Sequence, residues 1–427
     1  MQKQNYNFFI LIWSTQTLST LGNLILSYGI GIWIFLQTHR ALDVALGITA
    51  FYLPAWIFSR MVEKYIKLYS PEKILLYTSF CGLFLWALIE IIRNYQQSLI
   101  TIYFALIISG FLKSFQVPAL AIFIRKYSKN NDYQKNISLF SLGNATTALI
   151  SPEIATVLLK VGNGNINSLL ITNIISYFGI IYVLLITLKI KNIYSKEENK
   201  EQINPTKINI KKKYPTICIL IVFTSVMSFC SNLTYESILS PMILSRSNEN
   251  QTVLAIVNSF FGLGSICGGI LLTKKIFTIK NPYTVFYLSA LISFLFGDSL
   301  MALGQNCLIW CLAAIAATIP MPFVTAASNM IVYQNASVND HPKLFTQINS
   351  WESLMIPIGA FLGGYLADNF FTPLISRTNN LSFLLEKVVG KTEGSGMALM
   401  FLGTSIIGSL LSISGFFINK MISINKK

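Results

Sequence analysis

Twelve long runs of predominantly apolar residues follow one another along this sequence. Each is about 20 residues or longer, the length that a helix needs to cross the roughly 30 Å hydrocarbon core of a bilayer. Inside the bilayer only a helix or a closed barrel satisfies its own backbone hydrogen bonds. We therefore predict an all-α polytopic membrane protein with 12 transmembrane helices, at residues 7–36, 44–62, 73–93, 99–124, 137–160, 167–190, 215–244, 252–273, 283–303, 306–332, 346–370 and 395–418.

The composition favours the same class of protein. Charged residues make up only 11% of the chain, whereas soluble domains carry about 25%. The net charge of +15 would suggest nucleic acid as the partner of a soluble protein. Basic residues that flank membrane spans account for it here, so we expect membrane lipid and no nucleic acid as a partner.

The only long polar, charge-rich stretch divides the chain into six spans and six spans. We predict an N-terminal six-helix bundle at 1–190, a cytoplasmic linker at 191–214 and a C-terminal six-helix bundle at 215–427. The halves also resemble each other in their prolines: 34 residues separate Pro118 from Pro152, and 35 separate Pro322 from Pro357. Prolines at matching places predict two pseudo-symmetric bundles with bent or broken helices around a shared interior.

The distribution of Lys and Arg predicts the orientation. With the N-terminus inside, the inner segments hold 24 of the 32 basic residues and the outer segments hold seven. The reverse topology would violate the positive-inside rule. We expect both termini to be cytoplasmic in a multi-pass protein of the plasma (inner) membrane.

Motifs for other chemistry are missing from the sequence. The six cysteines form no CxxC pair, and the two histidines, His39 and His341, are expected in loops without an HExxH motif. We therefore expect no metal site and no enzyme activity. The only Walker-like fragment, GKT at 390–392, has Leu385 where the motif needs glycine, which argues against an ATP-driven pump.

Polar residues recur at helical spacing within several spans. Such stripes predict a path for water or substrate, although hydrogen bonding between helices is the alternative for small polar side chains. The stripe residues are Gln16, Thr20, Asn23 and Ser27 in span one; Ser109, Lys113 and Gln116 in span four; Thr146, Glu153 and Thr156 in span five; Ser225, Ser228, Asn232, Tyr235 and Glu236 in span seven; and Thr318, Thr325 and Asn329 in span ten.

Lys113 is the most unusual of these residues, because a lysine at the centre of a membrane helix costs roughly 2.5–3.5 kcal/mol on insertion scales. Glu153, at similar depth in the next span, is its candidate partner. A fixed pair would only join two helices. A pair that opens as substrate or a proton competes for one partner would take part in transport.

The remaining membrane acids are weaker candidates. Glu236 lies on the stripe of span seven and is the second choice for a coupling residue. Glu352 is expected close enough to the inner surface to be solvated. Asp298, Glu90 and Asp368 are expected at outer helix ends, where water would solvate them.

Short motifs spread over nearly the whole chain resemble the major facilitator superfamily, and within it the macrolide-efflux branch. The segments that carry the resemblance are WSTQTLSTLG (13–22), YGIGIWIFLQT (28–38), YLPAW (52–56), GLGSICGGILL (262–272), PKLFTQINS (342–350), PIGAFLGGYLAD (357–368) and FFTPLI (370–375).

The sequence departs from the family pattern at three places, one of which is Thr273, where the loop between helices eight and nine would carry an acid. In the loop after helix two, Ser59 replaces a glycine, and Glu63–Lys64 take the place of the usual Asp–Arg of this gating loop. The helix-five motif of antiporters appears as SPEIAT (151–156), which has lost two glycines and contains Glu153.

The resemblance implies a secondary transporter that works by alternating access, with no cofactor and the proton gradient as its energy source. It implies export of a small amphipathic molecule, such as an antibiotic, a siderophore or another secondary metabolite. Uptake of a small metabolite, or a non-transporting receptor of the same fold, are the alternatives. We expect a monomer with a small-molecule substrate.

Overall fold

The computed structural model describes residues 2–95, 98–127, 133–194, 213–273, 281–337, 340–376 and 380–424. Most of the predicted linker at 191–214 lies outside these ranges. The chain forms two compact units. Unit 1 comprises residues 1–33 and 50–208, and unit 2 comprises residues 34–49 and 209–427.

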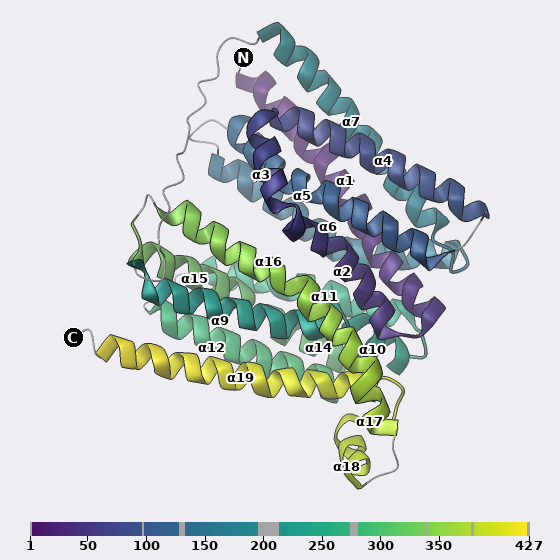
Figure 1. The fold of residues 1–427 in the computed structure, drawn as a ribbon, viewed down its shortest axis with the longest axis vertical. Helices are drawn as coiled ribbons and strands as arrows, with labels where there is room; N and C mark the ends of the chain where they lie inside the picture. Colours follow the sequence, from purple (N-terminus) through teal and green to yellow (C-terminus); the bar gives the residue numbers. More distant parts are fainter. Residues whose placement is uncertain are drawn as a thin grey trace. The chain divides into compact units, whose positions relative to one another are not determined.

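The described residues contain the predicted membrane helices (Figure 1). Eleven of them are long and apolar enough to span a bilayer, and α2 (Ala41–Ile57) is a shorter apolar helix. Only three residues separate the predicted spans nine and ten, because one helix ends at Leu303 and the next begins at Cys307, but the gap between Thr38 and Ala41 is shorter, so spans nine and ten are not the least separated. The expected all-α polytopic architecture is therefore correct.

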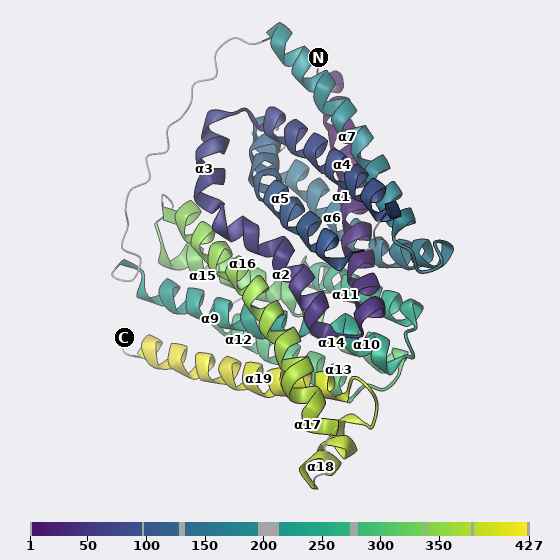
Figure 2. The ribbon, with the colours of Figure 1, turned by 45° about the vertical axis from the view of Figure 1, so that its right-hand side comes forward.

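Unit 1 is built from helices of the first half of the chain, without residues 34–49, which belong to unit 2. Its helices are α1 (Gln2–Thr38) up to residue 33, α2 from residue 50 onward, α3 (Ser59–Leu68), α4 (Pro71–Tyr95), α5 (Leu99–Tyr127), α6 (Tyr133–Val161) and α7 (Asn167–Tyr194). Helix α4 packs against α5 and α7. The chain bends between α2 and α3 (Figure 2), where Phe58 leaves helical geometry four residues after Pro54. A proline inside a helix is a common cause of such a bend.

Unit 2 consists of further membrane helices, several of which are interrupted. Its elements are α9 (Pro215–Ser231), η1 (Asn232–Glu236), α10 (Leu239–Arg246), α11 (Gln251–Thr273), α12 (Pro282–Ile292), η3 (Ser293–Asp298), α13 (Ser299–Leu303), α14 (Cys307–Thr318), α15 (Met321–Asn335), α16 (His341–Leu366), η5 (Ala367–Phe371), α17 (Thr372–Ser376), α18 (Asn380–Val389) and α19 (Ser395–Ile424). The elements η1, η3 and η5 are single π-helical turns within longer helices. Such turns are rare in proteins, and where they occur they often lie at functional sites.

The prolines act differently from one another. Pro118, Pro152 and Pro357 lie inside continuous helices. Pro322 lies in the first turn of α15, just after the break that separates α14 from α15. These four prolines are predicted to mark bent or broken helices. Among them, only Pro322 lies at a break between two helices.

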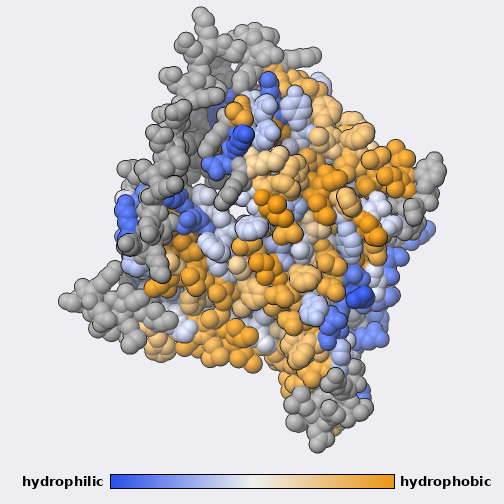
Figure 3. Space-filling model, viewed as in Figure 1, coloured by the Kyte–Doolittle hydropathy of each residue, from blue (hydrophilic) through white to orange (hydrophobic). Residues whose placement is uncertain are grey.

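Large apolar side chains remain exposed on the outer helices, as a lipid-embedded protein requires. On α19, Ile406 and Leu410 are each 61% exposed, and Phe417 is 58% exposed. Figure 3 shows an apolar surface over α12 and α19. The opposite face of α19 packs inward through Phe401, which is fully buried.

Candidate functional site

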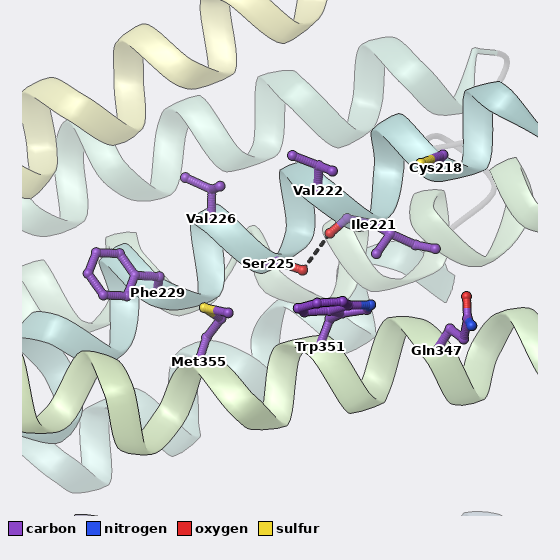
Figure 4. Close-up of a pocket in the computed structure, with 9 residues that line it drawn as sticks. All are labelled: Cys218, Ile221, Val222, Ser225, Val226, Phe229, Gln347, Trp351 and Met355. Atoms are coloured by element: carbon purple, nitrogen blue, oxygen red, sulfur yellow. Dashed lines mark hydrogen bonds between the residues drawn. The ribbon is translucent and has the colours of Figure 1, made fainter. Parts of the chain in front are cut away.

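A pocket of about 470 Å³ lies in unit 2 between α9 and α16 (Figure 4). Ligand pockets in proteins are typically about 300–1,000 Å³. From α16, Trp351 and Met355 point towards α9, as Figure 4 shows. The full lining is Cys218, Ile221, Val222, Ser225, Val226, Phe229, Gln347, Trp351 and Met355.

Two glycines explain why the pocket forms at one end of this helix pair and not the other. A Cβ at Gly359 would lie 3.0 Å from the Phe229 carbonyl oxygen, and a Cβ at Gly363 would collide with Leu233. The helices therefore touch backbone to backbone at these positions. About two turns before Gly359, α16 carries the bulky Trp351, whose ring lines the pocket.

The walls of the pocket are largely apolar. Ser225 donates its hydroxyl hydrogen to the Ile221 carbonyl at 2.6 Å, which leaves its oxygen able to accept. Gln347 supplies a second polar side chain, and among the described residues no acidic or basic side chain lines the pocket. This lining suits an apolar or aromatic group that carries a few hydrogen-bonding atoms.

Only one residue of the predicted stripe in span seven, Ser225, lines the pocket. Ser228 donates to the Glu352 carbonyl at 3.3 Å, which joins α9 to α16. The amide of Asn232, the first residue of η1, donates to the Ser228 carbonyl at 2.6 Å and to its hydroxyl at 3.0 Å. Part of this stripe therefore serves hydrogen bonding between and within helices.

Asn23 of the stripe in span one is held by α7. Its side-chain oxygen accepts hydrogen bonds from the Asn173 amide at 3.0 Å and the Tyr177 hydroxyl at 2.8 Å. Its amide nitrogen donates to the Ser19 carbonyl at 3.0 Å. The side chain thus joins two helices of unit 1, and its predicted contact with substrate stays a prediction.

Lys113 is exposed on α5, and its ammonium group lies beside two aromatic rings of α2. The nitrogen is 4.8 Å from the centre of the Phe51 ring and 5.8 Å from that of Tyr52. Cation–π contacts contribute about 0.5–2 kcal/mol, which offsets part of the cost of a lysine in a membrane helix. The helices approach closely here, because a Cβ at Gly110 would collide with the Phe51 carbonyl.

The other predicted coupling residues are distributed over both units. Glu153 is half-buried on α6, and Glu236 is exposed at the end of η1. The remaining amide side chains, at Gln16, Gln116 and Asn329, are half-buried on α1, α5 and α15. The pairing of Glu153 with Lys113 stays a prediction.

The predicted gating-loop residues, Glu63 and Lys64, lie exposed on α3. This part of the expected loop is therefore helical and belongs to α3. The fully buried carboxylate in the region is Glu72, at the start of α4, which pairs with Lys126 at 3.0 Å. Helical spacing along the sequence does not predict this pair, since its members are 54 residues apart.

The prediction that Asp298 is solvated at a helix end is wrong. It is 1% exposed, because α13 extends the helix beyond it and α14 and α19 pack against η3. Asp368 and Glu352 are half-buried, not simply solvated. The carboxylate of Asp368 accepts the backbone N–H of Ala41 at 3.2 Å and of Leu42 at 2.8 Å, and so caps the start of α2.

A polar cluster fixes the start of α9 to the segment before α16. The Asp340 carboxylate is 8% exposed and accepts hydrogen bonds from Lys213 at 2.7 Å, Tyr214 at 2.6 Å and Ser337 at 2.9 Å. Chiefly because of the Lys213 hydrogen bond, the pKa of Asp340 is lowered to about 2, and the pKa of Lys213 is raised.

The described residues contain no group of three or more His, Cys, Asp or Glu side chains that could hold a metal ion. His39 lies in the loop after α1, as expected, whereas His341 is the first residue of α16 and not a loop residue. The cysteines among the described residues are free.

The pocket residues on α16 were missed in the sequence. Trp351 and Met355 are apolar residues in an apolar run. The sequence cannot distinguish a Trp or Met that lines a pocket from one that faces lipid. Their spacing of four places them on one face of a helix, but that spacing does not show which face meets α9.

The succession of long apolar helices defines this protein as a polytopic α-helical membrane protein. Comparisons with solved structures give the same fold over nearly the whole chain. The chain is similar to the nucleoside transporter NupG, with 12% identity, a TM-score of 0.68 and coverage of 96% of this chain and 100% of that chain. It is also similar to a bacterial homologue of the human lysosomal transporter Spinster (15% identity, TM-score 0.68, 97% and 96% covered), and to a bacterial homologue of the iron transporter ferroportin (7%, 0.69, 96% and 99%).

The family model of the Major Facilitator Superfamily matches residues 12–360. The chain therefore belongs to the Major Facilitator Superfamily, and it is a transporter rather than an enzyme. No curated protein matches the sequence.

Proposed function

We propose that this chain is a secondary transporter that exports a small amphipathic molecule across the plasma membrane in exchange for protons. The observation that carries the proposal is the pocket between α9 and α16, with its apolar lining and the polar side chains of Ser225 and Gln347. An amphipathic substrate would place its apolar part against Trp351 and its hydrogen-bonding atoms near these two side chains.

The charge distribution supports the proposed orientation, with both termini in the cytoplasm, because 24 of the 32 basic residues then lie on the inner side. The resemblance to the macrolide-efflux branch supports export. Glu153 and Glu236 are the proposed proton-coupling acids among the residues selected from the sequence, and Lys113 competes for the carboxylate of Glu153.

Flux measurements with purified protein in liposomes test this function. Liposomes that carry a pH gradient are assayed with a panel of amphipathic antibiotics, siderophores and neutral metabolites, first chosen from those that accumulate in cells lacking the gene. We expect at least one compound to move uphill as protons move downhill, and the movement to stop when a protonophore collapses the gradient.

Two results would contradict the proposal. Uphill movement that follows the direction of proton flow would make the chain an uptake symporter. Saturable binding without any flux, in liposomes where a known transporter is active, would make it a receptor. The orientation is tested separately by labelling a single cysteine introduced near residue 420 with a membrane-impermeant reagent, which should react only after the membrane is opened.

A further inference from the structure

A carboxyl group is enclosed inside unit 2, away from the pocket. Asp298 is the last residue of η3 and is 1% exposed. The Tyr235 hydroxyl donates to one carboxyl oxygen at 2.6 Å, and the Thr404 hydroxyl donates to the other at 2.6 Å. These two donors come from η1 and α19, so three different membrane helices meet at this carboxyl group.

No basic side chain faces Asp298 from the described elements around it. Besides Tyr235, the titratable group next to it is Cys230 of α9. Arg246, at the end of α10, is occupied by the main-chain carbonyls of Ala302, Gly304 and Val389. Of the elements packed against η3, α12 carries Tyr283 and Tyr287, α14 carries Cys307 and Cys311, and neither α13 nor the described side chains of α19 contain a titratable group.

An ionised carboxylate in this position is costly, because the hydrocarbon region and packed side chains replace water around it. Two hydroxyl donors offset part of that cost, but no positive charge does. The protonated acid avoids the cost, provided that its new O–H hydrogen finds an acceptor.

Thr404 can provide that acceptor without movement of any heavy atom. Its hydroxyl oxygen lies 2.6 Å from Asp298 and also 3.1 Å from the Phe401 carbonyl. When Asp298 is ionised, Thr404 donates its hydrogen to the carboxylate. When Asp298 holds a proton, the Thr404 hydroxyl can rotate to donate to Phe401, and its oxygen then accepts the hydrogen from the acid.

We propose that Asp298 is a proton-binding site, with Thr404 as the hydroxyl that reverses its hydrogen bond when the proton arrives. The ligand is a single proton, added to the carboxyl oxygen that faces Thr404, and no other bond forms or breaks.

Tyr235 connects this site to the helix that lines the pocket. Its ring packs edge to face against Phe261 of α11 and Phe401 of α19, with ring centres 5.6 Å and 5.2 Å apart. Along the chain it lies directly between α9, which lines the pocket, and the exposed Glu236. A change of charge at Asp298 alters the bond that holds Tyr235, and thereby the π-helical turn η1. This last step rests on the proposed proton coupling, whereas the proton site itself does not.

Infrared spectroscopy of the whole protein in lipid nanodiscs tests the proton site without any substrate. We expect a carbonyl band of a protonated carboxylic acid that changes with pH and is lost in Asp298→Asn, a variant that keeps the size of the side chain and one accepting oxygen but has no carboxyl group to bind the proton. Glu249→Gln, at an exposed loop acid, is the control and should retain the band. Thr404→Val should shift the band, because the protonated acid then loses its acceptor. A spectrum of Asp298→Asn that matches wild type at every pH would overturn the proposal.

Flux measurements distinguish proton binding at Asp298 from its role in coupling proton movement to substrate transport. With an exported compound, Asp298→Asn should lose proton-driven uphill flux while retaining substrate exchange between the two sides of the membrane. Unchanged uphill flux in this variant would refute the coupling role of Asp298. If wild type itself shows no proton-driven flux, the proposed function fails, and the infrared band alone decides whether the proton site exists.

Discussion

Replacement of Trp351 tests the pocket most directly, because this ring forms its floor and is 47% exposed. An aromatic side chain has a surface of about 150–250 Å², so about 100 Å² is available to cover a substrate. At about 25 cal/mol per Å² of apolar surface, complete coverage contributes about 2.5 kcal/mol. Since about 1.4 kcal/mol is a factor of ten in affinity, Trp351→Ala should weaken binding by up to about 60-fold.

A conservative variant and a matched control make this number interpretable. Trp351→Phe keeps most of the ring surface and should weaken binding only about threefold, on the same area relation. Trp56→Ala removes a tryptophan of similar exposure, 53%, from α2, outside the pocket, and should leave affinity unchanged.

The assay is equilibrium binding of a radiolabelled compound that the flux screen identifies, measured on purified protein in detergent. Thermal unfolding of each variant confirms that the fold is intact, and little change is expected because Trp351 is half-exposed. If Trp351→Ala binds as tightly as wild type, or if Trp56→Ala weakens binding equally, the pocket between α9 and α16 does not hold the substrate.

Three further perturbations have defined outcomes. Gly110→Ala should lower the thermal unfolding temperature, because its Cβ would collide with the Phe51 carbonyl and overpacking costs about 1–3 kcal/mol; Gly31→Ala, which meets no atom within 4 Å, is the control. Lys113→Ala should abolish or uncouple flux, and the double variant with Glu153→Gln should restore membrane expression better than either single variant; normal flux in both single variants would exclude a role for the pair. Asp340→Asn should lower stability near neutral pH, as measured by thermal unfolding. The pKa of Asp340 is about 2, below its ordinary 3.8. The stabilisation of wild type by this carboxylate is therefore fully present above about pH 4 and is lost as the pH falls towards 2. The pKa of Lys213 is raised, so the stabilisation by its ammonium group is lost only as the pH rises above 10.5. A difference between Asp340→Asn and wild type that persists unchanged at pH 2 would refute this assignment.

The residues selected from the sequence and those that form the pocket overlap only at Ser225. Polar side chains such as those of the stripes are costly in lipid, and the structure shows that this cost is offset in several ways. Asn23 is bonded to α7, Ser228 to α16, and Lys113 lies beside aromatic rings. Polarity in a membrane helix thus indicates a partner, but the same pattern results from a helix contact and from a substrate path.

The sequence by itself determined the class of the protein and the succession of its apolar helices. These properties depend on the local cost of placing each segment in lipid, which can be read from neighbouring residues alone. The tertiary structure decided that Asp298 is enclosed, that Asp368 caps α2 and that Trp351 faces α9. In each case the deciding contact joins helices that are far apart along the chain: Asp298 to Thr404 across 106 residues, and Asp368 to Leu42 across 326. Hydropathy and helical spacing contain no information about which face of one helix meets another, because lipid and a neighbouring apolar helix favour the same side chains.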